Sequence, residues 1–94
     1  MEKYKIVYHP KVFRLDIPRL GSISKKLLLV VSKKLTLHPD MYGFRLHSPL
    51  KKYWKLRIED WRVIYEIKNS EVRIEVMGHR KEVYEIAKKR LGLV

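Results

Sequence analysis

The chain has 94 residues and a formal net charge of +12 at pH 7, with 22 lysines and arginines against 10 aspartates and glutamates. This length allows one domain, spanning 1–94, and is too short for two hydrophobic cores. Because the sequence has no cysteine, disulfide frameworks and zinc–thiolate sites are excluded, which is typical of a protein from a reducing cytoplasm. The strong positive charge predicts a polyanionic partner, such as a nucleic acid or an acidic protein.

Apolar runs in the sequence are short. The aliphatic run at 27–31 is closely flanked by lysines and is far shorter than a membrane span. Residues 1–5 lack the apolar segment of a signal peptide. We therefore expect a soluble protein of the cytoplasm with no membrane partner.

The first half of the chain predicts a strand followed by two helices. Residues 3–8 alternate as a strand does, and residues 12–17 begin a helix that Pro18 is expected to end or kink. A second helix, capped by a serine, is expected over about 22–38. Its apolar stripe, at spacings of three and four, needs a sheet to cover it and consists of Leu20, Ile23, Leu27, Val31 and Leu35. Together the two helices form a helical hairpin.

The second half predicts consecutive strands and a last helix. A loop over 38–43 leads into this part, and Asn69-Ser70 marks a turn between the last two strands. Consecutive strands with short turns imply an antiparallel β-sheet with helices on one face, an α+β fold. The expected elements are strands at 44–46, 53–58, 61–68 and 71–77 and a short C-terminal helix at 81–91.

The polarity of the central strands fixes how they pair. If residues 58–61 form a loop, Arg57 lies directly opposite Arg62, and a shift by one residue would bury arginines. Two opposed arginines repel each other, so the pair needs Glu66 nearby or an anionic ligand. The core face then collects Trp54, Leu56, Val63 and Tyr65. The opposite, cationic face collects Tyr53, Lys55, Arg57, Arg62, Ile64 and Glu66.

Further polar side chains follow the last predicted strand. This strand is expected to end at Gly78, where the backbone bends freely. His79 and Arg80 would then lie at the rim of the sheet beside the cationic face. Tyr84, one helical turn after Arg80, is expected to point the same way.

These segments, taken in order, closely resemble the RelE/ParE superfamily of type II toxin–antitoxin toxins, on its RelE-like side. The resemblance runs the length of the chain and includes the segments 8–12, 35–39 and 46–50. It implies a helical hairpin on an antiparallel sheet. It also implies a ribosome-dependent endoribonuclease, or mRNA interferase, that cuts the codon in the ribosomal A site. The nucleophile is the RNA's own 2′-hydroxyl, no metal or cofactor takes part, and the products carry a cyclic phosphate and a 5′-hydroxyl. The segments that carry the resemblance most strongly are 53–57, 60–67 and 78–84.

The resemblance also implies site residues. The family's active-site set is matched by Lys55, Arg62, Arg80 and Tyr84, and Arg57 matches an adjacent basic position. Where RelE proper has a further lysine, this chain has Tyr53, and Lys51 or Lys52 would take that lysine's place. Contacts to RNA and ribosome are therefore expected from Lys51, Lys52, Tyr53, Arg57 and Trp61.

The required chemistry assigns a role to each group. Arg62 and Arg80 suit the phosphate, since guanidinium groups can bridge two of its oxygens. Lys55 would be the base or a further stabiliser of charge, and Tyr84 would stack on a base or relay a proton. His79 is the candidate acid because imidazole titrates near neutrality. Plainer roles compete: Tyr84 anchoring the last helix, His79 fixing the bend after Gly78, and Trp61 at the rim of the core.

Partners and alternatives follow from the same resemblance. A toxin of this kind binds a cognate acidic, partly disordered antitoxin, the ribosome with its 16S RNA, messenger RNA and, through the antitoxin, operator DNA. One alternative is a ParE-like inhibitor of gyrase, although such relatives generally lack this set of cations. Another is a toxin homologue that no longer cleaves and represses its own operon.

Overall fold

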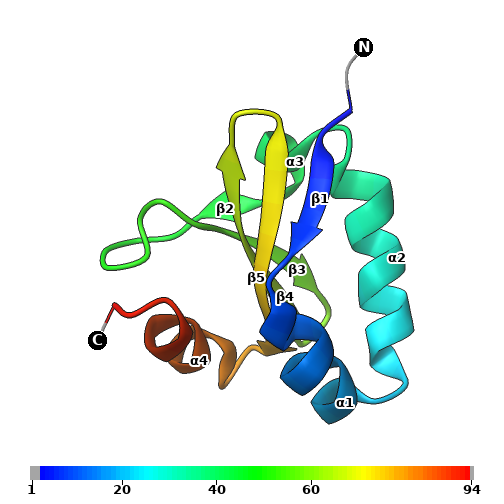
Figure 1. Ribbon diagram of the computed structural model, residues 1–94, viewed down its shortest axis with the longest axis vertical. Coiled ribbons are helices and arrows are strands. Elements are labelled where there is room, and N and C mark those ends of the chain that lie inside the picture. The colour runs from blue at the N-terminus through cyan, green and yellow to red at the C-terminus, as the bar shows by residue number, and fades with distance from the viewer. Residues whose placement is uncertain (1–2, 94) are drawn as a thin grey trace.

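A five-stranded sheet forms the centre of the computed structural model, which describes residues 3–93 (Figure 1). Residues 1–2 and 94, the ends of the predicted domain, lie outside that description. The strand order is β1-β5-β4-β3-β2. The strands are β1 (Lys5–Tyr8), β2 (Phe44–Arg45), β3 (Trp54–Ile58), β4 (Trp61–Lys68) and β5 (Glu71–His79).

The α+β fold is confirmed, with one difference in strand direction. Strands β2 to β5 pair antiparallel, as predicted, whereas β1 pairs parallel with β5. Tight turns fix the relative direction of consecutive strands only. The direction of β1 relative to β5 therefore could not be predicted from the turns.

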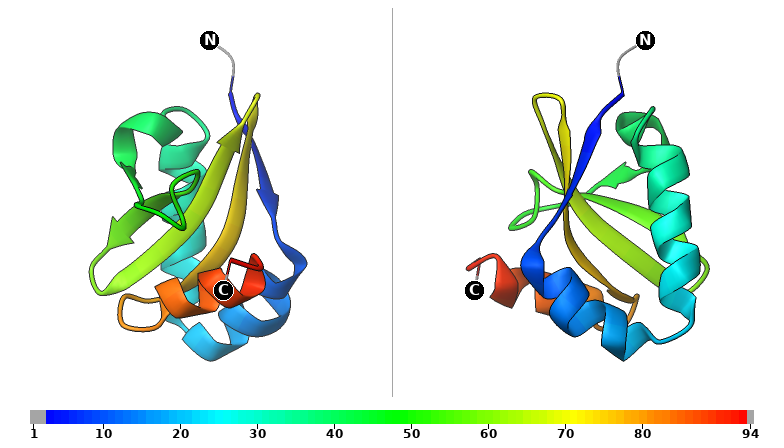
Figure 2. Two further views of the ribbon diagram at one scale, coloured as in Figure 1. Left: turned by 90° about the vertical axis from the view of Figure 1, so that its left-hand side faces the viewer. Right: turned by 45° about the vertical axis from the view of Figure 1, so that its right-hand side comes forward.

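The N-terminal helices differ in detail from the prediction. A π-helical turn, η1 (Val12–Asp16), runs directly into α1 (Ile17–Leu20), so the helix continues through Pro18. Pro18 is the second residue of α1 and has no N–H to donate to the π-helical turn before it. Gly21, with φ of 68°, ends this helix. Figure 2 shows it meeting the next helix, α2 (Ile23–Leu35), at a wide angle.

A short helix follows the second helix. The predicted helix over 22–38 ends at Leu35, and a further short helix, α3 (Pro39–Tyr42), lies in the segment predicted to be a loop. Pro39 suits the first position of this helix because its fixed φ is helical. Within residues 3–93, every helix is too short or too polar to cross a membrane.

Helices cover both faces of the sheet (Figure 2). On one, here called the N-helix face, side chains from η1, α1 and α2 pack against Leu56, Val63, Tyr65 and Ile74. The last helix, α4 (Val83–Arg90), packs on the opposite, C-helix face. The prediction that all helices share one face is wrong, because apolar side chains on the cationic face also need cover. The C-helix core consists of Leu50, Tyr53, Ile64, Val76, Val83 and Ala87.

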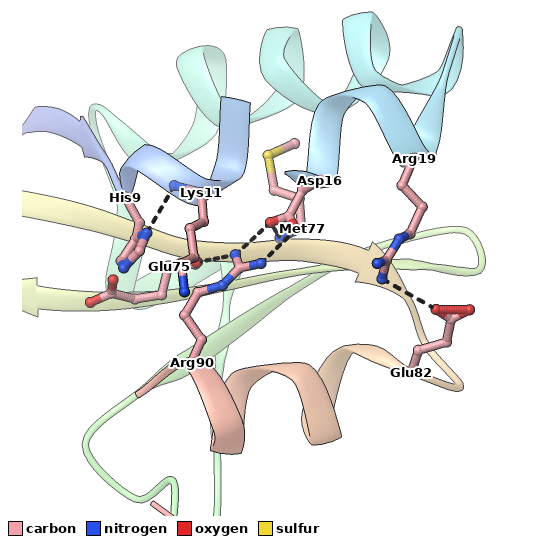
Figure 3. Close-up of polar contacts among 8 residues, drawn as sticks. All are labelled: His9, Lys11, Asp16, Arg19, Glu75, Met77, Glu82 and Arg90. Atoms are coloured by element: carbon pink, nitrogen blue, oxygen red, sulfur yellow. Dashed lines mark hydrogen bonds and ion pairs between the residues drawn. The ribbon is translucent and has the colours of Figure 1, made fainter. Parts of the chain in front are cut away.

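A buried ion pair joins the N-terminal helix to α4 across the edge of β5 (Figure 3). Arg90 Nη1 and Nη2 donate to Asp16 Oδ2 and Oδ1 at 2.8 and 2.9 Å. Asp16 Oδ2 also accepts from the backbone N–H of Met77, and Arg90 Nη1 donates to the carbonyl oxygen of Glu75. Strand β1 pairs with β5 only as far as Ile74. The ion pair thus satisfies backbone groups of β5 that lie beyond its neighbouring strand.

Candidate functional site

The β3–β4 hairpin has the predicted register. Arg57 lies opposite Arg62, and Lys55 lies opposite Ile64. The connection is shorter than the predicted loop over 58–61, since Ile58 already pairs with Trp61 and only residues 59–60 form the turn. The alternation of buried apolar residues therefore fixed the register even though the turn length was wrong.

The guanidinium group of Arg62, the residue opposite Arg57, folds back onto the β3–β4 turn. Its Nη1 donates to the carbonyl oxygens of Glu59 and Trp61, both at 2.8 Å, and the residue is only 8% exposed. No buried side-chain nitrogen within residues 3–93 lacks a partner, so the other nitrogens of Arg62 reach the surface. Arg57 is exposed and forms no ion pair with any described residue. Backbone carbonyls, and not the expected Glu66, accept the hydrogen bonds of this cationic pair.

Lys55 and Tyr84 meet where β3 borders α4. The ammonium nitrogen of Lys55 lies 5.8 Å from the centroid of the Tyr84 ring, and both residues are half-buried. A lysine at this distance is attracted by the negative face of the ring. Strand alternation puts Lys55 on the same face as Arg57 and Arg62. The structure thus brings four of the predicted site residues together on the C-helix face.

Arg80 lies in the turn before α4 and not within the helix. Its backbone N–H donates to the carbonyl oxygen of Asp60 at 2.8 Å, and its Nε lies 3.4 Å from Asp60 Oδ1. The expected helical spacing between Arg80 and Tyr84 is therefore wrong. The Arg80 side chain is instead held at the end of the β3–β4 hairpin, and it is about half exposed.

His79 lies on the opposite face from Arg62. Strand β5 continues through Gly78 to His79, so alternation directs His79 to the N-helix face, opposite Trp61. The two rings are T-shaped, with centroids 5.2 Å apart. The Nδ1 of His79 accepts the backbone N–H of Lys81 at 3.2 Å. The predicted position of His79 beside the cationic face is wrong, because the strand does not end at Gly78.

The segment before β3 presents lysines and hides its tyrosine. Tyr53 is 5% exposed and belongs to the C-helix core, which contradicts the expectation that its ring contacts RNA. Burial raises the pKa of its hydroxyl above the ordinary value. Lys52 lies over this ring, 5.5 Å from its centroid, and its ammonium is 3.8 Å from Glu66 Oε2. Lys51 and Lys52 are both exposed, so they supply the cations of this segment.

The two acidic residues of the β3–β4 turn, each a possible partner of Arg57 from its place in the sequence, pair with other cations. Glu59 forms an ion pair with Lys26 of α2, and Asp60 holds Arg80. They are the only acids between Arg57 and Arg62 in the sequence. The expected pairing of Arg57 with one of them is therefore not found among the described residues. Among residues 3–93, no three histidines, aspartates or glutamates lie close enough together to hold a metal ion.

Comparison with known proteins places the whole arrangement in a family. A family model described as the ParE toxin of the type II toxin–antitoxin system parDE matches residues 18–84. Among solved structures, one chain of the RelBE2 toxin–antitoxin complex from Mycobacterium tuberculosis is similar with a TM-score of 0.72 at 21% identity. That match covers 83% of this chain and 99% of that chain. No match was found among curated protein sequences.

Two further structures show the same fold at lower similarity. YafQ from E. coli matches with a TM-score of 0.56 at 24% identity, covering 83% of this chain and 94% of that one. The RelB–RelE complex from Methanococcus jannaschii matches with a TM-score of 0.56 at 16% identity, covering 85% and 96%. These similarities concern the fold.

Proposed function

Because this chain belongs to the RelE/ParE superfamily of type II toxin–antitoxin toxins, we propose that it is a ribosome-dependent endonuclease of messenger RNA. The observation that carries this proposal is the approach of Lys55 to Tyr84 on the face that also bears Arg57 and Arg62. Three cations on one face of the sheet, one of them beside an aromatic ring, suit an RNA phosphodiester and its adjoining base. The activity belongs to the cytoplasm, where translating ribosomes are found.

The proposed reaction is an attack of the 2′-hydroxyl on the adjacent phosphorus. Its proton passes to a base, the 2′-oxygen–phosphorus bond forms, and the bond to the 5′-oxygen breaks. The leaving 5′-oxygen takes up a proton, which gives a 2′,3′-cyclic phosphate and a 5′-hydroxyl. In this proposal Lys55 and Tyr84, which lie side by side, handle these protons in either order.

Charge on the phosphorane would be stabilised by the arginines. Arg62 keeps nitrogens free of the turn carbonyls, and Arg57 has no competing carboxylate among the described residues. Such preorganised donors stabilise developing negative charge without having to reorganise. Arg80 would join them by exchanging Asp60 for phosphate, because this exposed ion pair is weak. His79 has no part in this proposal, since it lies on the other face of the sheet.

A cognate acidic antitoxin is the proposed protein partner. Chains of similar fold include members of the complexes named RelBE2 and RelB–RelE. A protein with a net charge of +12 attracts an acidic segment over long range. The other proposed partners are the ribosome, with its 16S RNA, and the message, with operator DNA reached through the antitoxin.

The test uses translating ribosomes that hold a defined message in the A site. We expect the purified protein to produce new 5′-hydroxyl ends within the A-site codon, and none on the same message without ribosomes. Mapping the 5′ ends and identifying the 2′,3′-cyclic phosphate checks both the position and the chemistry. An intact message under these conditions would refute the nuclease.

Inhibition of gyrase is the second candidate function, and the match to the ParE family model favours it. The discriminating assay is supercoiling by purified gyrase. Inhibition of supercoiling together with an intact message would assign the chain to the ParE-like class. If both assays are negative, the remaining alternative is a non-cleaving homologue that represses its operon with an antitoxin.

A further inference from the structure

A cleft lies at the free edge of β5, between the end of α1 and the start of α4. It has a volume of about 210 Å³. Its aromatic and apolar side chains come from the N-helix face of the sheet and from the two helices, whereas Lys55 and Arg62 extend from the opposite face. Its walls include Arg19, Leu20, Trp61, Met77, His79 and Glu82.

Two half-buried aromatic rings form part of this cleft. Trp61 and His79 are direct neighbours across β4 and β5, and their ring planes are 87° apart. A perpendicular pair leaves at least one ring face uncovered by the other ring. The second tryptophan of the chain, Trp54, stacks on Tyr65, and both tryptophans also pack against the core of the N-helix face. Of the two, Trp61 lines the cleft, so its indole is the surface at which a flat ligand would stack there.

The rim of the cleft carries one carboxylate and one guanidinium group. Glu82 and Arg19 approach to 4.0 Å, and their side chains are 56% and 61% exposed (Figure 3). An exposed pair at this distance is weak, so both groups remain available to a ligand. Because Nδ1 of His79 accepts a backbone N–H, the neutral ring carries its proton on Nε2 and can donate from there.

The indole, carboxylate, guanidinium and imidazole groups of the cleft are complementary to the ring face and the polar edge of a guanine base. Guanine has two adjacent donors, N1–H and the N2 amino group, which a carboxylate can accept together, and its O6 accepts from a cation or an imidazole N–H. Adenine lacks the N1 donor, and a pyrimidine covers less of an indole. Guanine is thus the base that would use Glu82 and Trp61 at once.

One of the groups assigned to phosphate adjoins the cleft. His79 in the cleft wall is followed directly by Arg80, whose side chain is held by Asp60 at the β3–β4 turn. We propose that the cleft binds a guanine base of single-stranded RNA next to the phosphodiester that is cut. This inference rests on the proposed function for its substrate, but the base site can be measured without the ribosome.

The test measures Trp61 fluorescence in the Trp54→Phe protein, so that one tryptophan reports. The protein is titrated separately with GMP, AMP, CMP, UMP and ribose 5-phosphate. We expect GMP to quench Trp61 and to bind at least about fivefold more tightly than ribose 5-phosphate, the size expected of one stacked base. AMP should bind more weakly than GMP.

Glu82→Gln is the diagnostic variant, and Glu85→Gln is its matched control. Glu85 lies in the first turn of α4, which directly follows Glu82; it is 71% exposed and forms an ion pair with Lys88. Glu82→Gln should weaken GMP binding by about fivefold or more, because a carboxylate accepting two N–H groups becomes an amide. Glu85→Gln should leave GMP binding unchanged, and ribose 5-phosphate should bind alike to both variants. Unfolding midpoints establish that each variant is folded.

Two results would overturn the base site. One is equal binding of GMP and ribose 5-phosphate, and the other is an equal effect of the two glutamine substitutions. The proposed nuclease fails separately, since it is judged by new message ends on ribosomes. Cleavage of the message with no quenching of Trp61 by GMP would leave the nuclease standing and remove this site.

Discussion

The hydroxyl of Tyr65 occupies the space that a side chain at position 43 would need. An ideal Cβ on Gly43 would lie 1.8 Å from the Tyr65 hydroxyl oxygen and 3.0 Å from the backbone carbonyl oxygen of Lys55. Tyr65 is fully buried and donates to the carbonyl oxygen of Pro39 at 2.6 Å. Gly43 thus allows β2 to reach β3, where the next residue, Phe44, pairs with Lys55. The strand that carries Lys55 depends on this close approach.

Gly43→Ala is therefore expected to destabilise the protein by about 1–3 kcal/mol, the usual cost of forcing an extra methyl group into a packed site. In a Tyr65→Phe background the same substitution should cost less, because the hydroxyl oxygen is gone. Urea unfolding of the two single variants and the double variant gives the coupling energy between the residues. Purely additive changes would contradict this account.

The buried Asp16–Arg90 pair should matter far more than an exposed one. Arg90→Met leaves the Asp16 carboxylate buried without its partner and should cost about 3–5 kcal/mol of unfolding free energy. Arg19→Met breaks the exposed pair with Glu82 and should cost about 0–1 kcal/mol. Denaturant unfolding at neutral pH measures both. Similar losses in the two variants would show that the buried pair does not stabilise the fold.

Glu75 should make stability depend on pH. Its pKa lies above the ordinary value of 4.5 because the carboxyl is partly buried and, second, because Glu66 is near. Arg73, Lys52 and Arg90 oppose this shift. The folded state therefore holds the proton more tightly than the unfolded chain. Its contribution to stability is complete below pH 4.5 and is lost as the pH rises through the raised pKa.

Glu75→Gln removes the loss of stability at higher pH, because the amide does not ionise. We expect this variant to be more stable than wild type at pH 7, with the difference shrinking as the pH falls from 7 toward the ordinary carboxyl pKa of 4.5. Thermal unfolding of both proteins across this pH range is the measurement. Glu85→Gln, at an exposed carboxyl on α4, serves as the control. A gain for Glu75→Gln that is constant with pH would refute the assignment to this carboxyl.

The sequence predicted the parts of the site that depend on strand alternation. Arg57 and Arg62 were placed opposite each other because a shift by one residue would have put arginine on the apolar core face. The stripe of Leu27, Val31 and Leu35 was likewise found buried. Strand alternation and a helical apolar stripe are local features of the sequence. They arise because one face of each strand or helix must be buried.

The remaining features depend on tertiary packing that local patterns do not contain. His79 lies on the N-helix face and not beside the cationic face as predicted, because β5 continues through Gly78. Glycine allows a bend in the backbone without requiring one. The sequence did not show on which face of the sheet α4 lies. In the structure α4 packs on the C-helix face, where it covers the buried side chain of Ile64. The pairing of Asp16 with Arg90 joins residues 74 positions apart, which no spacing rule relates.

The central claim is that Lys55, held beside Tyr84 on the cationic face, belongs to the cleavage centre. The most direct test is the single-turnover rate of A-site cleavage on ribosomes for wild type, Lys55→Ala and Lys33→Ala. The last variant removes one charge from the exposed surface of α2 and leaves this face intact. We predict that Lys55→Ala slows cleavage by about 100-fold or more, while Lys33→Ala stays within about twofold of wild type. Equal rates for the two variants, with both folded, would contradict the assignment of the site to this face.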